Sequence, residues 1–214
     1  MEKRNIETLR SEYKLAGLNK KDLERSPFLQ FEKWLTQAIE FPVKEPLAMA
    51  VATFGTNGFP QSRIVLLRHF SPEGFVFYTN YNSEKGKSIS LNPRVSLHFF
   101  WPDLERQVRI LGKAEKTDAD KSAEYFHSRP LNSQLSAVIS EQSAVVPSRN
   151  YLEKKFEKLK ITLKNKKPLC PDYWGGYLVK PTYFEFWQGG ENRLHDRLVF
   201  ENDNNTWQVK RLAP

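Results

Sequence analysis

Between residues 47 and 115, short apolar runs alternate with tight-turn signals, and this rhythm constrains the fold more than any other feature. The turns Thr56-Asn57-Gly58 and Ser71-Pro72-Glu73-Gly74 are typical of hairpins. Strands are predicted at 47–54, 61–70, 75–80, 95–101 and 107–115, with one short helix at 83–91. Strands at such short intervals favour an antiparallel barrel or sandwich, and the region lacks the GxGxxG motif and βαβ alternation of a Rossmann domain.

Helices are expected on both sides of this strand-rich region. Ser26 and Pro27 are typical of an N-cap and a first helical position, and apolar residues then recur at helical spacing through 27–41. Further helices are predicted at 118–128, 131–139 and 148–164, and closing strands at 173–179, 183–187, 197–201 and 207–212, with a turn at 202–205. We interpret the lysines of the 148–164 helix as a solvated face.

The net charge of +8 and the pI near 9.5 indicate anionic partners, which include nucleic acid, acidic membrane and phosphorylated small molecules. Cys170 is the only cysteine, which fits a reducing cytosol, and the spacing of the histidines predicts no metal site. The charged N-terminus and the absence of a long apolar run predict a cytoplasmic protein that does not enter a membrane. We predict a mobile N-terminal arm at 1–25, with a frayed end as the alternative, and a single domain at 26–214.

The stretch Trp187–Leu198 carries basic side chains at alternate positions: Arg193, His195 and Arg197. In an extended strand, alternate side chains share one face, so these three would form a row of cationic donors. Such a row suits an anion, or an electron-rich ring that gains negative charge during a reaction. The alternative is a hairpin turn followed by an exposed basic strand.

Basic residues also interrupt the apolar strands. Arg63 and Arg68 flank an apolar run of four residues, and Gln107 and Arg109 lie in another strand. Charges in such positions are either exposed or committed to a ligand. Because Arg63 and Arg68 differ in parity, a regular strand would point them to opposite faces, which suggests two anion sites or a site shared across an interface.

Two segments have the composition of phosphate sites. The start of the helix at 83–91 offers backbone N–H groups, hydroxyls and Lys85, although an ordinary capped helix would have the same sequence. Tyr125, Arg129 and Ser133 are spaced by four around a helix break, and their hydroxyls and guanidinium could hold a phosphate dianion. The alternative for this second group is a core tyrosine and a surface arginine.

Taken together, these motifs resemble the pyridoxine/pyridoxamine 5′-phosphate oxidase family over nearly the whole chain, from about Arg10 to Pro214. The resemblance rests on Gln61–Arg68, Phe77–Asn80, Asn92–Leu97, Glu105–Arg109, Tyr125–Pro130, Trp187–Leu198 and Arg211–Pro214. It implies a mainly β fold with flanking helices: an antiparallel, Greek-key-like, FMN-binding split β-barrel. It also implies a homodimer with two FMN sites at the subunit interface.

The resemblance assigns roles to individual residues. FMN would be bound by Arg63, Ile64, Val65, Leu66, Leu67, Arg68, Tyr78, Thr79, Lys85, Gln107, Gln142, Ser143, Trp187 and Arg197, with Arg63 and Lys85 at its phosphate. The substrate would be bound by Arg10, Tyr13, Arg68, Tyr125, Arg129, Ser133, Arg193 and His195. Arg193 and His195 would be the catalytic pair and would orient the substrate ring; neither is expected to be an obligatory base.

The reaction implied is the oxidation of pyridoxamine 5′-phosphate or pyridoxine 5′-phosphate to pyridoxal 5′-phosphate in vitamin B6 salvage. Oxygen is the acceptor, hydrogen peroxide is released, and the amine also yields ammonia. Arg197 would stabilise negative charge that grows on the flavin. Two positions depart from the family pattern: Arg68 stands where lysine is familiar, and Glu84 stands where some members carry arginine, which leaves Lys85 with more of the work.

Two alternatives belong to other classes. One is a non-catalytic protein of the same fold that binds pyridoxal phosphate and FMN, against which the presence of Arg193 and His195 argues. The other is a basic β-barrel that binds nucleic acid, which would show a steep dependence on salt. No aromatic stacking motif supports the second alternative, so nucleic acid is not expected as a partner. A membrane is not expected as a partner either, because the sequence has no long apolar run.

Overall fold

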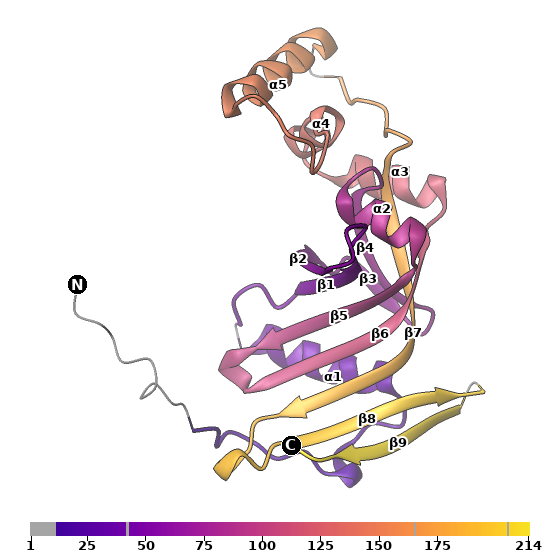
Figure 1. The fold of residues 1–214 in the computed structure, drawn as a ribbon. Helices are drawn as coiled ribbons and strands as arrows, with labels where there is room; N and C mark the ends of the chain where they lie inside the picture. Colours follow the sequence, from indigo (N-terminus) through magenta and orange to yellow (C-terminus); the bar gives the residue numbers. More distant parts are fainter. Residues whose placement is uncertain (1–11, 42, 165, 205) are drawn as a thin grey trace. The chain divides into compact units, whose positions relative to one another are not determined.

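The computed structural model describes residues 12–41, 43–164, 166–204 and 206–214. Its described strands form one sheet with the order β2-β1-β5-β6-β7-β4-β3, and β8 and β9 continue from β7 (Figure 1). The pairs β1–β2, β3–β4, β4–β7, β7–β8 and β8–β9 are antiparallel. The predicted class, a mainly antiparallel β fold with flanking helices, is therefore confirmed.

The chain divides into two compact units. The central unit comprises 47–97 and 111–181, and the terminal unit comprises the described residues up to 46 together with 98–110 and 182–214. Strands β5 (Arg94–Trp101), β6 (Arg106–Lys116) and β7 (Trp174–Gln188) each have residues in both units. The boundary of a single domain at 26–214 stays a prediction.

The central unit is built from hairpins that follow the predicted turns. β1 (Ala48–Phe54) pairs with β2 (Pro60–Leu66) across the turn that contains Gly58, and β3 (His69–Ser71) pairs with β4 (Gly74–Asn80) across the second turn. The predicted continuous strand at 61–70 is wrong, because β2 ends at Leu66. The Leu67 N–H then donates to the Leu47 carbonyl at 2.9 Å, and the Leu67 side chain enters the core.

Four helices follow the predicted spans within the central unit. They are α2 (Glu84–Leu91), α3 (Ala119–Ser128), α4 (Leu131–Ile139) and α5 (Arg149–Leu163). Ser83 caps α2 by accepting from the Gly86 N–H at 3.3 Å, and Ser148 caps α5 in the same way. α5 has no fully buried residue among those described, which agrees with a solvated lysine face.

The core of the terminal unit is aromatic and lies around α1 (Pro27–Glu40). Ser26 caps this helix and Pro27 opens it, as predicted. Phe31 packs on Phe99 with a ring-centroid distance of 5.0 Å, and Trp34 meets Phe186 edge-on at 5.3 Å. These rings are almost fully buried, so the strand faces that they cover are fixed by a large apolar area.

The end of the chain differs from its prediction in one important respect. The two strands predicted at 173–179 and 183–187 are one continuous strand, β7, which is drawn as a single long arrow in Figure 1. Its first half pairs with β4, and its second half pairs with β8 (Asp196–Asp203). β9 (Thr206–Leu212) closes the sheet beside β8, as predicted. No helix in the described part of the chain is long and apolar enough to cross a membrane.

Gly74 provides a test of the close contact between the start of β4 and β7. Its φ is +146°, and an added Cβ would lie 2.2 Å from the carbonyl oxygen of Val179. Gly58 also has a positive φ, of +81°, but open space surrounds its missing Cβ. We expect Gly74→Ala to lower the free energy of unfolding by about 2–4 kcal/mol, since backbone strain and a steric clash combine.

The matched control Gly58→Ala carries the backbone strain alone and should cost only about 1 kcal/mol. Urea unfolding followed by tryptophan fluorescence measures both changes. Equal losses for the two variants would contradict the proposed contact with β7.

Candidate functional site

An open pocket of about 290 Å³ lies in the central unit. It is lined by Ile64, Val65, Leu66, Arg68, Tyr78, Thr79, Asn80, Lys85, Tyr125, Arg129, Gln142 and Trp174. Ten of these twelve residues are among those assigned to FMN or substrate from the sequence. β2, β4, α2, the end of α3, the segment after α4 and the start of β7 therefore bring together side chains that are up to 110 positions apart (174 minus 64).

Lys85 is the buried cation of this pocket, with only 8% of its surface exposed. Its Nζ donates to Gln142 Oε1 at 2.9 Å and to Thr79 Oγ1 at 3.2 Å, and lies 3.4 Å from Ser83 Oγ. Burial, assisted by the charge of Arg63, lowers the pKa of Lys85 to about 8. An ammonium group held away from water by neutral partners favours an incoming anion.

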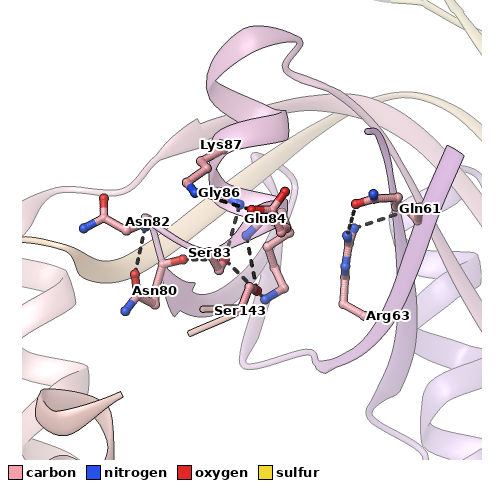
Figure 2. A network of polar contacts seen from close by, with 10 residues as sticks. Gln61, Arg63, Asn80, Asn82, Ser83, Glu84, Gly86, Lys87 and Ser143 are labelled. Carbon is pink, nitrogen blue, oxygen red and sulfur yellow. Dashed lines mark hydrogen bonds and ion pairs between the residues drawn. The ribbon is translucent and has the colours of Figure 1, made fainter. Parts of the chain in front are cut away.

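Arg63 lies close to Lys85 and is held by its own strand pair. Its Nη1 donates to Thr53 Oγ1 at 2.8 Å, and its Nη2 donates to Gln61 Oε1 at 3.3 Å. Figure 2 shows Arg63 and Gln61 across from the first turn of α2, where the Glu84 N–H donates to Ser143 Oγ at 3.3 Å (Figure 2). Burial lowers the pKa of Arg63, and the charge of Glu84 opposes that shift.

A second cationic group lies in the same pocket. The guanidinium of Arg129 stacks over the Trp174 ring at 4.7 Å, and its Nη2 donates to the Ser133 carbonyl at 3.1 Å. Arg129 Nη1 is buried without a hydrogen-bond partner among the residues that the structure describes. Burial, with a contribution from the charge of Arg68, lowers the pKa of Arg129, and an anion would satisfy this unpaired donor.

The terminal unit holds a cluster of three rings. Trp187 and His195 have centroids 4.8 Å apart, and Tyr13 meets them edge-on at 5.6 and 5.5 Å. The Gly190 N–H donates to His195 Nδ1 at 3.1 Å. Because Nδ1 accepts this bond, the neutral imidazole carries its proton on Nε2.

The predicted row of three cations on one strand face is wrong. Arg193 lies in a short 3₁₀ turn, η4 (Glu191–Arg193), with φ of +62°, and β8 begins only at Asp196. Arg197 alone belongs to a strand, and its Nε donates to Glu185 Oε1 at 2.8 Å. Two consecutive residues with positive φ break the alternation on which the prediction depended.

Glu185 is a site residue that sequence reasoning missed. Its buried carboxylate forms ion pairs with Arg197 and Arg109, which come from the strands on either side, and it accepts from the Tyr183 hydroxyl at 3.2 Å. These partners lower the pKa of Glu185 against the effect of burial. Asn80 and Trp174 were missed as well. An acidic residue inside an apolar strand was the available signal for Glu185.

The remaining predicted residues take varied positions. Gln107 bonds to His98 Nε2 at 2.9 Å, in the terminal unit. Ser133 contributes its backbone carbonyl to Arg129, and Arg10 lies outside the described residues. The parity argument for Arg63 and Arg68 does not hold, since β2 ends before Arg68 is reached.

The residues present fit FMN and a phosphorylated substrate. A buried ammonium, two guanidiniums and an unpaired N–H donor gather in one pocket, and a monoanion or dianion would satisfy them. Tyr78 and Tyr125 are stacked with centroids 3.9 Å apart, and Trp174 lies parallel to both. Planar ligands commonly pack against such rings.

Two family models match the chain. Residues 35–162 match the model described as pyridoxamine 5′-phosphate oxidase. Residues 174–214 match the pyridoxine 5′-phosphate oxidase C-terminal dimerisation region. The chain belongs to the pyridoxamine 5′-phosphate oxidase family. The second match covers Trp187, Arg193, His195 and Arg197, so this cluster lies in the dimerisation region of a family member.

Individual relatives agree with this assignment. The pyridoxine/pyridoxamine 5′-phosphate oxidase of Crocosphaera subtropica is 51% identical over 98% of this chain and 100% of its own length. The structure of PhzG from Burkholderia lata, in complex with tetrahydrophenazine-1-carboxylic acid, has a TM-score of 0.88 at 26% identity and covers 95% of this chain and all of PhzG. A pyridoxamine 5′-phosphate oxidase-related, FMN-binding protein from Nostoc punctiforme has a TM-score of 0.71 at 16% identity, covering 90% and 100%, which shows the split-barrel fold.

If Arg63 binds the FMN phosphate, Arg63→Ala should weaken FMN binding roughly 10- to 100-fold, because one charge-assisted contact would be lost. Quenching of FMN fluorescence during titration of the apoprotein measures the affinity. Arg94→Ala, at an exposed position on β5, removes the same charge and should leave the affinity unchanged. Equal effects in both variants would mean that only net charge matters.

The affinity for FMN should also depend on pH through Lys85. The ammonium is charged below its pKa of about 8 and a bound phosphate favours that form, so the affinity is full below pH 8. Above pH 8 the free protein loses the charge, and the dissociation constant should rise by up to about tenfold per pH unit. In Lys85→Gln the dissociation constant should be higher at pH 7 and constant from pH 7 to 9. A wild-type titration that stays flat over that range would contradict this role.

Proposed function

We propose that this protein is an FMN-dependent oxidase that converts pyridoxamine 5′-phosphate and pyridoxine 5′-phosphate to pyridoxal 5′-phosphate. The observation that carries the proposal is the pocket that holds Lys85 and Arg129 beside stacked aromatic rings, in a chain of this family. Two electrons leave C4′ of the substrate and reduce oxygen to hydrogen peroxide. The amine first becomes an imine, which water hydrolyses to the aldehyde and ammonia.

FMN, when bound, supplies the redox group that takes a hydride and passes two electrons to oxygen. Arg63 and Lys85 would hold its phosphate, with Thr79, Gln142 and Ser143 around them. The family resemblance assigns further cofactor contacts to Ile64, Val65, Leu66, Leu67, Arg68, Tyr78, Gln107, Trp187 and Arg197. The burial of Lys85 supports this assignment, because a bound phosphate would replace the favourable interaction with water that the ammonium loses on burial.

Arg129, Tyr125, Ser133 and Arg68 would bind the substrate phosphate. The Trp174 ring fixes the plane of the Arg129 guanidinium, and the unpaired Nη1 is the donor that a phosphate oxygen would satisfy. A guanidinium that is already oriented loses little conformational entropy when it binds. Binding energy from the phosphate then positions the reacting C4′ atom, which is remote from it.

His195 and Arg193 would orient the substrate ring, with Arg10 and Tyr13 on the same ligand. Because His195 Nδ1 already accepts from the Gly190 N–H, Nε2–H remains as the hydrogen-bond donor that can face a ligand. This supports an orienting role over that of an obligatory base. Arg197, held by Glu185, would place positive charge near the flavin, where negative charge grows.

The protein acts as a homodimer, as its match to the dimerisation region indicates. We place the dimer in the cytoplasm, which the lone Cys170 and the bacterial relatives support. Fractionation of cells that express the native chain would test this location, and recovery in the membrane or periplasmic fraction would contradict it.

The decisive experiment is an absorbance spectrum followed by an oxygen-electrode assay. The purified protein should absorb near 450 nm and consume oxygen with either phosphorylated vitamer, producing hydrogen peroxide. FMN-loaded protein that takes up no oxygen but binds pyridoxal phosphate would instead support the non-catalytic alternative.

Arg193→Ala should lower kcat/KM roughly 100-fold or more while FMN stays bound, since one oriented cation over the ring is lost. Steady-state oxygen uptake measures the rate, and the 450 nm absorbance measures retained FMN. Arg149→Ala, on the exposed face of α5, is the matched control and should retain full activity. Loss of FMN together with activity would show that Arg193 belongs to the cofactor site.

A further inference from the structure

Glu105 occupies an unusual position at the corner between β5 and β6. It ends the short turn η3 (Pro102–Leu104) in the left-handed region, with φ of 54° and ψ of 40°. Its side-chain carboxylate accepts hydrogen bonds from two consecutive backbone N–H groups on a distant segment: Lys14 at 3.3 Å and Leu15 at 3.0 Å. About 90 residues separate these partners in the sequence, so the contact is purely tertiary.

The backbone carbonyl of Glu105 also accepts two hydrogen bonds. Its carbonyl accepts from the Gly189 N–H at 2.8 Å and from Gln188 Nε2 at 3.2 Å. One residue thus joins the N-terminal segment, through its carboxylate, to the end of β7, through its carbonyl. The joined end of β7 leads from Trp187 to η4, which contains Arg193 and is followed by His195.

The segment Tyr13–Leu18, which we name the strap, is fixed at both ends. At the far end the Leu18 N–H donates to Asp196 Oδ2 at 2.8 Å, and Arg211 bridges Asp196 and the Leu18 carbonyl, the latter at 3.0 Å. Leu18 itself is buried. At the near end, Glu105 is the anchor.

Tyr13 begins the strap and reaches the ring cluster. Its ring lies so close to Gly189 that an added Cβ there would stand 2.8 Å from the ring atoms. It meets both Trp187 and His195 edge-on. The residue next to Tyr13 is the first that Glu105 holds, so the carboxylate fixes the backbone from which this ring extends.

We propose that Glu105 is a positioning residue of the substrate site: its carboxylate fastens the strap so that Tyr13 stays against Trp187 and His195. This inference rests on the proposed function, because it assigns the ring cluster to substrate binding. Glu105 contacts neither cofactor nor substrate and acts through Tyr13. Losing the anchor leaves the strap free to leave the ligand, which raises KM and leaves the chemical step intact.

Glu105→Gln is the informative variant, because it keeps the side-chain shape and the backbone bonds but retains only one acceptor oxygen. We expect KM for pyridoxamine 5′-phosphate to rise about three- to tenfold, with kcat changed less than twofold and FMN affinity unchanged. Glu115→Gln, on β6 with an exposed ion pair to Lys180, is the control for loss of a carboxylate and should behave as wild type.

A double-mutant cycle separates positioning from general stabilisation. If Glu105 acts through Tyr13, the KM of Glu105→Gln/Tyr13→Ala should equal that of Tyr13→Ala alone. Effects on KM that multiply, or an unchanged KM in Glu105→Gln, would overturn the proposal.

A readout without turnover keeps the test independent of the proposed function. Trypsin cleavage after Lys14, followed by mass spectrometry of the FMN-loaded protein, should be several-fold faster in Glu105→Gln than in wild type or Glu115→Gln. Equal cleavage rates would overturn the anchoring role, whatever the enzyme oxidises. Faster cleavage in a protein that oxidises neither vitamer would keep the anchor and reject the function.

Discussion

The continuity of β7 is the constraint on which the rest of the structure depends. β7 is one strand of fifteen residues that pairs with β4 in the central unit and with β8 in the terminal unit. Its backbone N–H and C=O groups therefore form hydrogen bonds with strands of both units. Trp174, at its first position, stacks with the Arg129 guanidinium, and Trp187, near its end, belongs to the ring cluster. Glu185 on the same strand holds Arg197. One strand therefore carries residues of both the pocket and the ring cluster.

Burial of the cationic side chains in the pocket is energetically unfavourable, because it removes them from water. Lys85, Arg63 and Arg129 are partly or fully withdrawn from water, and burial lowers the pKa of all three. Neutral oxygens of Thr79, Ser83 and Gln142 surround the Lys85 ammonium, whereas Arg129 Nη1 is buried without a partner among the described residues. A bound phosphate would offset this desolvation and would stabilise the folded protein. In the terminal unit, by contrast, Glu185 forms ion pairs with both Arg109 and Arg197, so its single negative charge balances one of their two positive charges.

The departure at Glu84 has a local explanation in these contacts. Glu84 lies in the first turn of α2, and its N–H donates to Ser143 Oγ, while its side-chain Oε1 lies 3.4 Å from Lys87 Nζ. The backbone at residue 84 thus serves the helix start whatever its side chain is. The acidic side chain opposes the pKa shift of Arg63, so it weakens the local positive potential.

Much of the fold was predictable because local rules decide it. Ser26 and Pro27 start α1, Ser83 starts α2, and glycines make the two hairpin turns, each through a preference of one or two residues. The errors fell where tertiary contacts override the local pattern. The strand at 61–70 breaks because Leu67 pairs with Leu47, and β7 continues through Lys180 and Pro181 because it has partners on both sides. The alternation in Trp187–Leu198 suggested a strand, but Asn192 and Arg193 adopt positive φ, which no spacing rule anticipates.

By itself, the sequence determined the types and order of the elements, the positive charge and the motifs that mark the family. It did so because propensity, capping and turn chemistry act over a few residues. Only the tertiary structure decided which charges meet. Arg129 stacks on Trp174, Glu185 joins Arg109 to Arg197, and Glu105 binds the N–H groups of Lys14 and Leu15. Each of these contacts joins residues 12 to about 90 positions apart, and such pairs are fixed by strand pairing and burial, which leave no periodic trace in the chain.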